Sequence, residues 1–316
     1  MAVYQSVSTR RGSLEYMVQE GKVTVTGYSG SDLEVSVPAE LDGLPVTVIA
    51  KKTFLSRKQL KRVFLPPSLE EIGDFAFTFC SNLESVWIPR NTCKVGSRIF
   101  MECKGIRKLY LYDCAEYQKE NIEAPLRKTT DPEAEQKASL LAAAALLLDA
   151  EYLFRPLDAG TAEWISQWDS RMEQFMKTED QEGYTRMILC GEEDVGSSLD
   201  LYLNKRRREK VRLAMIRLMN PLGLRPELEQ EWKNYLADHT KGCTSEETWE
   251  VLLEEHSHEQ EYFRLFAETG CLTEENFDAI LRDMKDEHAE MKSFFIRYRE
   301  EEMAPVDFFA SLSLDL

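Results

Sequence analysis

The sequence predicts an α+β chain in which a short solenoid, with one strand per 23-residue unit, precedes an all-α helical-repeat domain. Three observations predict this class: a tandemly repeated segment in the first half, helical spacing of the later apolar residues, and a sharp change in charge. Residues 1–128 carry 18 Lys and Arg against 15 Asp and Glu, whereas residues 129–316 carry 21 against 41. These net charges of +3 and −20 sum to −17, and they predict two domains, 1–128 and 129–316.

The repeat becomes visible when residues 60–82 are aligned with residues 83–105, and a third copy begins at residue 106. A unit of this length with one short strand cannot bury its apolar side alone, so neighbouring units are expected to stack around a continuous core. The aligned columns are Leu60, Leu83 and Ile106; Val63, Val86 and Leu109; Leu65, Ile88 and Leu111; Ile72 and Val95; Phe77 and Phe100; and Cys80 and Cys103.

An irregular copy precedes the regular ones. Its Ile49 and Phe54 lie one full repeat before Ile72 and Phe77, whereas its strand, residues 35–38, is displaced by a five-residue insertion. Proline cannot donate to a strand ladder, so prolines are expected to end the strands. These prolines are Pro38, Pro66 and Pro89.

The stretches "IGDFAFTFC" and "LESVWIP" resemble the units of the BspA-type leucine-rich repeat family. Those units read as an isoleucine-glycine turn, an alanine-phenylalanine pair, a cysteine and a strand ending in proline. "VGSRIFMEC" is similar, with Ile99 in place of the alanine, and the lead-in from Gly21 is similar to the family's entry segment. The resemblance covers about residues 14–112 and implies a bacterial leucine-rich solenoid.

The cysteines are predicted to be packing residues. There are seven, an odd number, without a CxxC pair, which indicates reduced thiols rather than a disulfide framework. The competing hypothesis is a redox or metal site at Cys80, Cys93, Cys103 and Cys114. No histidine lies in residues 1–128 to complete a mixed zinc site, so we expect no metal and no cofactor.

The predicted binding site is the outer face of the strands. Side chains alternate along a strand, so if Val86 and Ile88 point into the core, Trp87 points outward. Its equivalents in the neighbouring units are also aromatic, and an exposed aromatic strip with basic neighbours is typical of an interaction surface. The alternative is that the helical domain covers this strip. The site comprises Phe64, Trp87 and Tyr110, flanked by the column Arg62, Ser85 and Lys108.

The second half is predicted to be helical. Thr130 or Asp131, with Pro132, forms a helix start, and residues 160–178 place tryptophans and methionines on one apolar face. Capping boxes are predicted at Thr244–Glu247 and at Ser257–Gln260, and Gly270 suits a helix end. Residues 265–298 are weakly similar to ankyrin-type helix pairs, although the TPLH opening of that repeat is absent.

Charge and hydropathy restrict the partners. An acidic half is a poor match for nucleic acid, and the basic cluster 205–210 is expected to pair with acidic residues of its own domain. The longest apolar run, residues 140–148, is far shorter than the ~20 residues that cross a bilayer, so no membrane insertion is expected. The first residues lack a signal-peptide pattern. We therefore expect a cytoplasmic location, although BspA-type proteins often lie at the cell surface.

No catalytic motif is present. The sequence lacks GxSxG, a phosphate loop and HExxH, and His256 and His258 are expected to be solvated or capping residues. The leading hypothesis is a non-catalytic protein–protein interaction or scaffold protein. A self-assembling structural protein with the aromatic strip buried, homo-oligomers included, is the alternative, and a hydrolase with an unrecognised site is the third.

Overall fold

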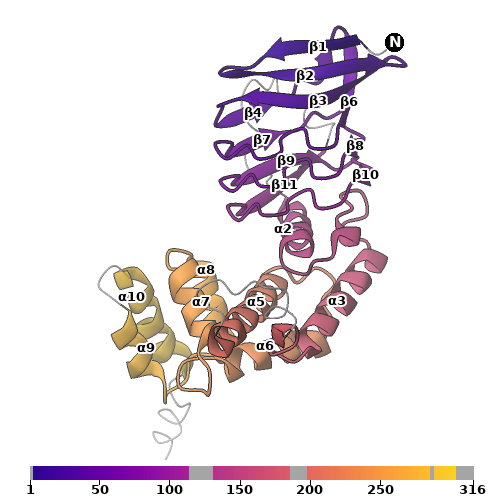
Figure 1. Cartoon of the computed structure of the whole chain (residues 1–316). Helices are drawn as coiled ribbons and strands as arrows, with labels where there is room; N and C mark the ends of the chain where they lie inside the picture. Colours follow the sequence, from indigo (N-terminus) through magenta and orange to yellow (C-terminus); the bar gives the residue numbers. More distant parts are fainter. Residues whose placement is uncertain (1–2, 114–130, 186–197, 285–287, 304–316) are drawn as a thin grey trace, which may run out of the picture. The chain divides into compact units, whose positions relative to one another are not determined.

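The computed structural model describes residues 3–113, 131–185, 198–284 and 288–303 (Figure 1). The chain divides into two compact units, the first formed by residues 1–176 with 220–223 and the second by residues 177–219 with 224–316. The predicted domain boundary after residue 128 lies outside the described residues. The compact units divide later along the chain, so that α2 (Pro132–Leu146) and almost all of α3 (Ala162–Lys177) belong with the strands of unit 1.

Unit 1 contains two sheets (Figure 1). Sheet A has the strand order β1-β2-β3-β6-β8-β10, with β5 paired to β6, and sheet B has the order β11-β9-β7-β4 with all its pairs parallel. The strands of sheet A are β1 (Val3–Ser8), β2 (Gly12–Gln19), β3 (Lys22–Gly30), β5 (Glu40–Leu41), β6 (Leu44–Ile49), β8 (Glu71–Ile72) and β10 (Lys94–Val95). Those of sheet B are β4 (Glu34–Ser36), β7 (Arg62–Phe64), β9 (Ser85–Pro89) and β11 (Lys108–Tyr112).

The strand register confirms the 23-residue stack. In sheet B, β7, β9 and β11 pair residue for residue at this spacing, and β4 joins β7 with Val35 opposite Val63. The sequence separation of those two valines equals one repeat plus the predicted five-residue insertion. The structure adds a second, two-residue strand to each regular unit, β8 and β10, which places the isoleucine-glycine turns at sheet A.

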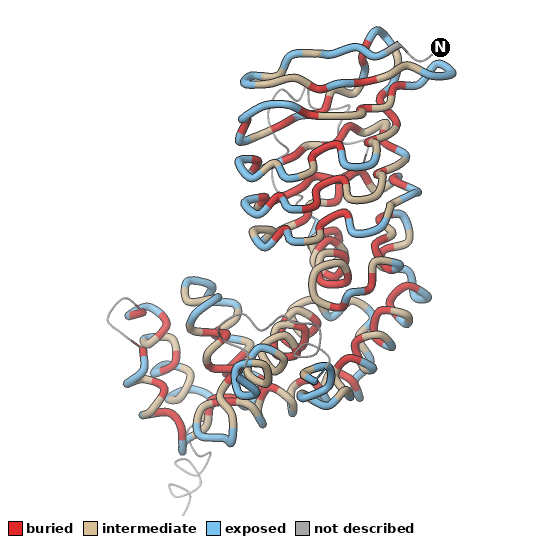
Figure 2. Tube along the Cα trace, viewed as in Figure 1, coloured by how far each residue is buried: buried red, intermediate tan, exposed pale blue. Residues whose placement is uncertain are grey.

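The core of unit 1 is built from columns of residues that occupy equivalent positions in successive repeats. Figure 2 shows that buried residues recur at each level of the solenoid. The phenylalanine column continues upstream to Tyr28 and ends on Phe154, which meets the last ring edge-on at 5.6 Å. Ring centroids lie 5.2 to 5.7 Å apart along the column Tyr28, Phe54, Phe77 and Phe100. Offset aromatic pairs at this spacing add to the free energy gained by burial.

Close approach of neighbouring units explains the glycine in each turn. A Cβ atom on Gly73 would lie 2.5 Å from the backbone nitrogen of Lys51, and one on Gly96 would lie 2.4 Å from that of Asp74. Real Cβ atoms do not approach backbone so closely, so the turn requires glycine. Two further columns adopt left-handed backbone with φ of 53° to 63°; they are Lys52, Phe75 and Arg98, and Ser56, Phe79 and Glu102.

The repeat cysteines pack in the core, as predicted. The Cys80 thiol donates to the Phe54 carbonyl and the Cys103 thiol to the Phe77 carbonyl, each at 3.0 Å. Burial raises the pKa of Cys80 to about 11 and that of Cys103 to about 12, so both remain protonated at neutral pH. Cys93 is free and exposed, and Cys114 lies outside the described residues.

Eight α-helices are described after residue 130. Asp131 caps α2 by accepting the Glu133 amide at 3.0 Å, which confirms the predicted helix start, and the buried tryptophans of α3 confirm its apolar face. Unit 2 holds the other six, α5 (Leu199–Met219), α6 (Pro226–Asp238), α7 (Glu247–Glu255), α8 (Gln260–Glu268), α9 (Phe277–Asp283) and α10 (Ala289–Tyr298). A π-helical turn, Arg299–Met303, follows α10.

The predicted capping boxes do not form. α7 and α8 begin after Glu246 and Glu259, and neither start has a side-chain cap. Helix α7 begins later than the sequence predicts because the Glu246 carboxylate folds back onto Lys241, at 2.8 Å, and onto the Gly242 amide, at 3.2 Å. The prediction for Gly270 is correct, since this residue follows α8 with a φ of +79°.

Candidate functional site

The predicted aromatic residues meet on the outer face of sheet B. We call Phe64, Trp87 and Tyr110 the sheet-face ladder. Parallel in-register pairing places these three rings one above another, with centroids 4.1 Å apart for the first pair and 4.4 Å for the second. The rings of the second pair are almost parallel, with an interplanar angle of 7°. The rings therefore form one continuous stack that crosses three repeat units.

The rings differ in exposure. Trp87 is 7% exposed, whereas Phe64 and Tyr110 are half-buried. Each face of the Trp87 indole lies against a neighbouring ring, which covers the parts of the side chain that alternation alone leaves in solvent. An outward-pointing residue in the middle of the stack thus has both ring faces covered by its own equivalents.

The flanking column carries paired charges rather than free positive charge. Arg62 Nε lies 2.7 Å from Glu34 of β4, and Lys108 Nζ lies 3.1 Å from Glu135 of α2 and 5.3 Å from the Tyr110 ring centroid. Ser85, between them, is buried. The basic flank expected from the sequence is therefore a mixed-charge column. Such surface pairs contribute at most about 1 kcal/mol each, so a partner's carboxylate could replace either acceptor.

Tyr112 supports this face, and the sequence interpretation did not single it out. Its hydroxyl donates to the Leu65 carbonyl at 2.6 Å. The Leu65 N–H donates to the Trp87 carbonyl. In a regular parallel ladder the Leu65 carbonyl would accept the N–H of residue 89, but Pro89 has no N–H. Tyr112 supplies the missing donor. A signal was available, because this tyrosine occupies the column that holds Pro66 and Pro89 in the earlier units.

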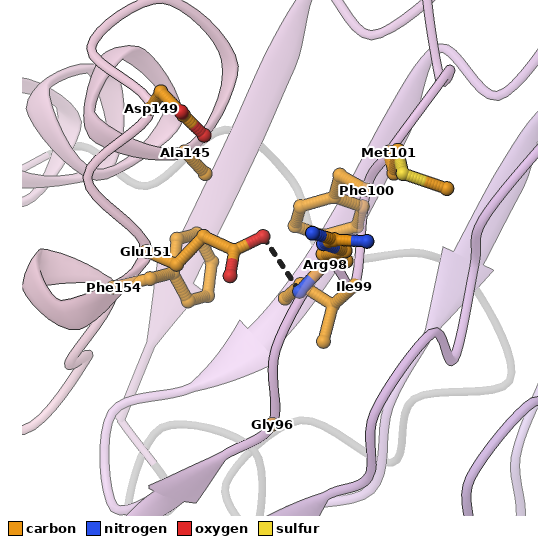
Figure 3. A pocket seen from close by; sticks show the side chains of 9 residues that line it. All are labelled: Gly96, Arg98, Ile99, Phe100, Met101, Ala145, Asp149, Glu151 and Phe154. Carbon is orange, nitrogen blue, oxygen red and sulfur yellow. Dashed lines mark hydrogen bonds between the residues drawn. The ribbon is translucent and has the colours of Figure 1, made fainter.

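A pocket of 390 Å³ lies where the repeat of residues 83–105 meets α2 and the segment that follows it (Figure 3). In the preceding units the residue at the left-handed turn donates its N–H to the next unit, as Phe75 does to the Ser97 carbonyl. The N–H of Arg98, the equivalent residue one repeat later, donates to the Glu151 carboxylate at 2.6 Å. The lining residues are Gly96, Arg98, Ile99, Phe100, Met101, Ala145, Asp149, Glu151 and Phe154. This set contains two carboxylates, Asp149 and Glu151, and no histidine, serine or cysteine.

The predicted role of the basic cluster is confirmed in unit 2. Arg207 and Lys210 bind the Asp180 carboxylate at 2.8 and 2.7 Å. Arg208 reaches Glu254 and Glu255, each at 2.7 Å. Burial by itself would raise the pKa of Glu255, but hydrogen bonds from Arg212 and Arg208 outweigh it and lower the value to about 2. The cluster therefore serves ion pairs within unit 2.

The histidines have ordinary partners. His256 follows α7 as its C-cap, stacks on Tyr262 at 3.6 Å, and its Nδ1 lies 3.1 Å from Glu259. The rings of His258 and His288 lie 6.3 Å apart. Within the described part of the chain, no three His, Cys, Asp or Glu side chains gather in a way that could hold a metal ion. The described helices also include none with the length and hydropathy needed to traverse a bilayer.

Comparison with known proteins agrees with the repeat. Residues 44–122 match the BspA type leucine rich repeat region, which confirms the resemblance for this part of the chain. A leucine rich repeat protein of T. pallidum is 26% identical, with a TM-score of 0.31, over 34% of this chain and 50% of that one. A leucine rich cell surface protein from Faecalibacterium prausnitzii is 24% identical, with a TM-score of 0.29, over 34% and 30%. A leucine-rich repeat protein from Bacteroides ovatus is 24% identical, with a TM-score of 0.30, over 33% and 29%.

The chain spans half or less of the length of these three structures. No curated protein is significantly similar to it.

Proposed function

We propose that this chain, whose residues 44–122 are BspA-type leucine-rich repeats, is a non-catalytic protein-binding module that recognises a protein partner through the outer face of sheet B. Leucine-rich repeat proteins typically bind other proteins. The binding surface is the sheet-face ladder together with the column Arg62, Ser85 and Lys108. The observation that carries this proposal is the continuous stacking of the three aromatic rings across neighbouring units.

The stack suits recognition because it is already ordered. Tyr, Trp and Arg are the residues that most often dominate binding energy at protein interfaces. Rings held at 4.1 and 4.4 Å have little rotamer freedom left to lose when a partner docks, so the entropic cost of binding is small. The half-exposed Phe64 and Tyr110 offer apolar edges, and Arg62 offers a charge that can exchange Glu34 for an acidic partner.

A site-specific photocrosslinker tests this surface. Placed at Arg62, it should label a discrete protein in an extract of the source cells, whereas the same group at Lys94, on sheet A, should not. Replacing Tyr110 by alanine should reduce the labelling at least about tenfold, the result of losing one well-buried contact. Equal labelling from both positions, or labelling unaffected by the Tyr110 change, would contradict the proposal.

The burial of Trp87 favours a second candidate, in which the ladder stabilises the solenoid and the protein is a structural component. If this candidate is right, Trp87→Ala lowers the stability of unit 1. Arg62→Glu and Tyr110→Ala then leave the binding of the chain to other proteins unchanged. The binding proposal requires the opposite result for the last two variants.

Location forms a separate part of the proposal. We keep the cytoplasmic expectation. Detection of peptides of this chain among those that a protease releases from intact source cells would overturn it.

A further inference from the structure

We propose that strand β1 forms a second interaction surface, on which the same strand of another copy of this chain pairs antiparallel, with Ser6 on the two-fold axis. Sheet A would then continue from one copy into the other. This inference does not rest on the proposed binding face, because β1 belongs to sheet A and the sheet-face ladder to sheet B.

The backbone of β1 leaves one row of polar groups without a strand partner. Among the described residues β1 pairs only with β2. Thr9 donates its N–H to the Gly12 carbonyl at 2.9 Å, so Thr9 and Gly12 form the hydrogen-bonded pair next to the turn of this hairpin. Because such pairs alternate in an antiparallel ladder, Val7 and Gln5 bond to β2, and the residues between them face away from it. The N–H and C=O groups of Tyr4, Ser6 and Ser8 therefore line the free edge.

This edge lacks the features with which proteins usually protect an edge strand. Natural edges carry charges, prolines or bulges, or are covered by other elements. The six residues VYQSVS contain neither a charge nor a proline, and their register with β2 is unbroken. Tyr4 is 71% exposed, and Gln5, Ser6 and Ser8 are exposed as well. The strand is therefore a ready template for another extended strand.

Charge and symmetry favour a second copy as the occupant. The chain carries −17 overall, but residues 129–316 hold −20 and residues 1–128 hold +3, so two copies repel each other least through their N-terminal parts. A two-fold axis at Ser6 places Tyr4 opposite Ser8 of the other copy and Ser6 opposite its equivalent. The free N–H and C=O groups of Tyr4, Ser6 and Ser8 are then all paired with those of the other copy, which gives about six new backbone hydrogen bonds.

Proline at position 6 tests the pairing without disturbing the hairpin. The Ser6 N–H does not bond to β2, and proline is tolerated on an edge strand when its missing N–H faces solvent. Analytical ultracentrifugation of the native chain should show a species of twice 36.5 kDa. Ser6→Pro should raise the dimer dissociation constant at least about tenfold, because two central hydrogen bonds are lost and their acceptors stay unpaired. Ser6→Thr, which keeps the N–H, should leave the dimer intact.

A crosslink tests the register. Opposite residues of a hydrogen-bonded pair lie ~5.5 Å apart between Cα atoms, within the range of a disulfide. Ser6→Cys should therefore give a covalent dimer on mild oxidation. Ser8→Cys should not, because the two copies of residue 8 would be ~13 Å apart along the strands. The native chain, which has its own exposed Cys93 and Cys243, provides the background level.

Three results would overturn the proposal: a native chain that is monomeric at 100 µM, a dimer unaffected by Ser6→Pro, or equal crosslinking through residues 6 and 8. A monomer that binds an extended peptide of another protein at β1 would assign the edge to a different occupant and would also overturn it. If Ser6→Pro does not fold, Ser6→Glu keeps the backbone and opposes two carboxylates across the axis, with the same expected loss of the dimer. Variants of Phe64 or Tyr110 should leave the dimer unchanged, which separates this test from that of the binding face.

Discussion

The two units of the chain are stabilised in different ways. In unit 1 a residue meets its own equivalent from the neighbouring repeat, as Phe77 does with Phe54 and Phe100, so one contact recurs at every level. In unit 2 the contacts around α5 join unlike groups, such as Arg208 and Glu255, which no repeat relates. Position within the repeat therefore predicts the effect of a substitution in unit 1, whereas in unit 2 the effect depends on the particular contacts of each residue.

The largest effect is expected in the phenylalanine column. Phe77→Ala should lower the free energy of unfolding of unit 1 by about 3–5 kcal/mol, because it leaves a cavity between two stacked rings. Denaturant unfolding, followed by hydrogen exchange in residues 44–113, measures the loss. Phe79→Ala is the matched control, since Phe79 is 45% exposed and should cost far less. Similar losses for both variants would contradict the column interpretation.

A smaller effect is expected at the glycine turn. Gly96→Ala should destabilise unit 1 by about 1–3 kcal/mol, because the added Cβ would lie 2.4 Å from the Asp74 backbone nitrogen and the units would have to separate. Thermal unfolding measured beside the native chain gives the change. The control is Ala50→Gly, in the same column of the irregular copy, where a Cβ is already accommodated; a larger loss there than at Gly96 would refute the explanation.

The smallest effect is expected in unit 2 and should depend on pH. Glu255→Gln should lower stability by about 1 kcal/mol at neutral pH, since the half-buried arginines keep only a neutral acceptor. The folded pKa of Glu255, about 2, lies below its ordinary value of 4.5, so its contribution is full above pH 4.5 and is lost as pH falls toward 2. The difference between variant and native chain should therefore shrink over that interval. A difference that stays constant from pH 6 to pH 2.5 would show that Glu255 acts by packing alone.

Much of unit 1 was predictable because the repeat states which residues become neighbours. The constant repeat length placed Phe64, Trp87 and Tyr110 at equivalent positions, which the register confirms, and alternation along the strand predicted that all three share one face. The cysteine column followed from the same reasoning. The second strand of each unit was missed because two residues are too few to show a period.

The properties of the candidate site were less predictable. Nothing in the repeat indicates that Glu34 and Glu135 take up the charges of Arg62 and Lys108, because both glutamates lie outside the regular units. The acceptor of the Arg98 N–H was equally unpredictable from the sequence. Glu151 is the acceptor because the chain after α2 returns to Arg98, and no residue spacing indicates such a return.

The sequence alone predicts the stack, because it shows which residues share a column and which of them share a face. It could do so because identical units leave only one way to superpose their apolar sides. The folded structure was needed to show how much of Trp87 is covered, which carboxylates neutralise the flanking column, and that Tyr112 replaces the donor missing at Pro89. These features depend on distances between non-equivalent groups, and such distances exist only after the chain has folded.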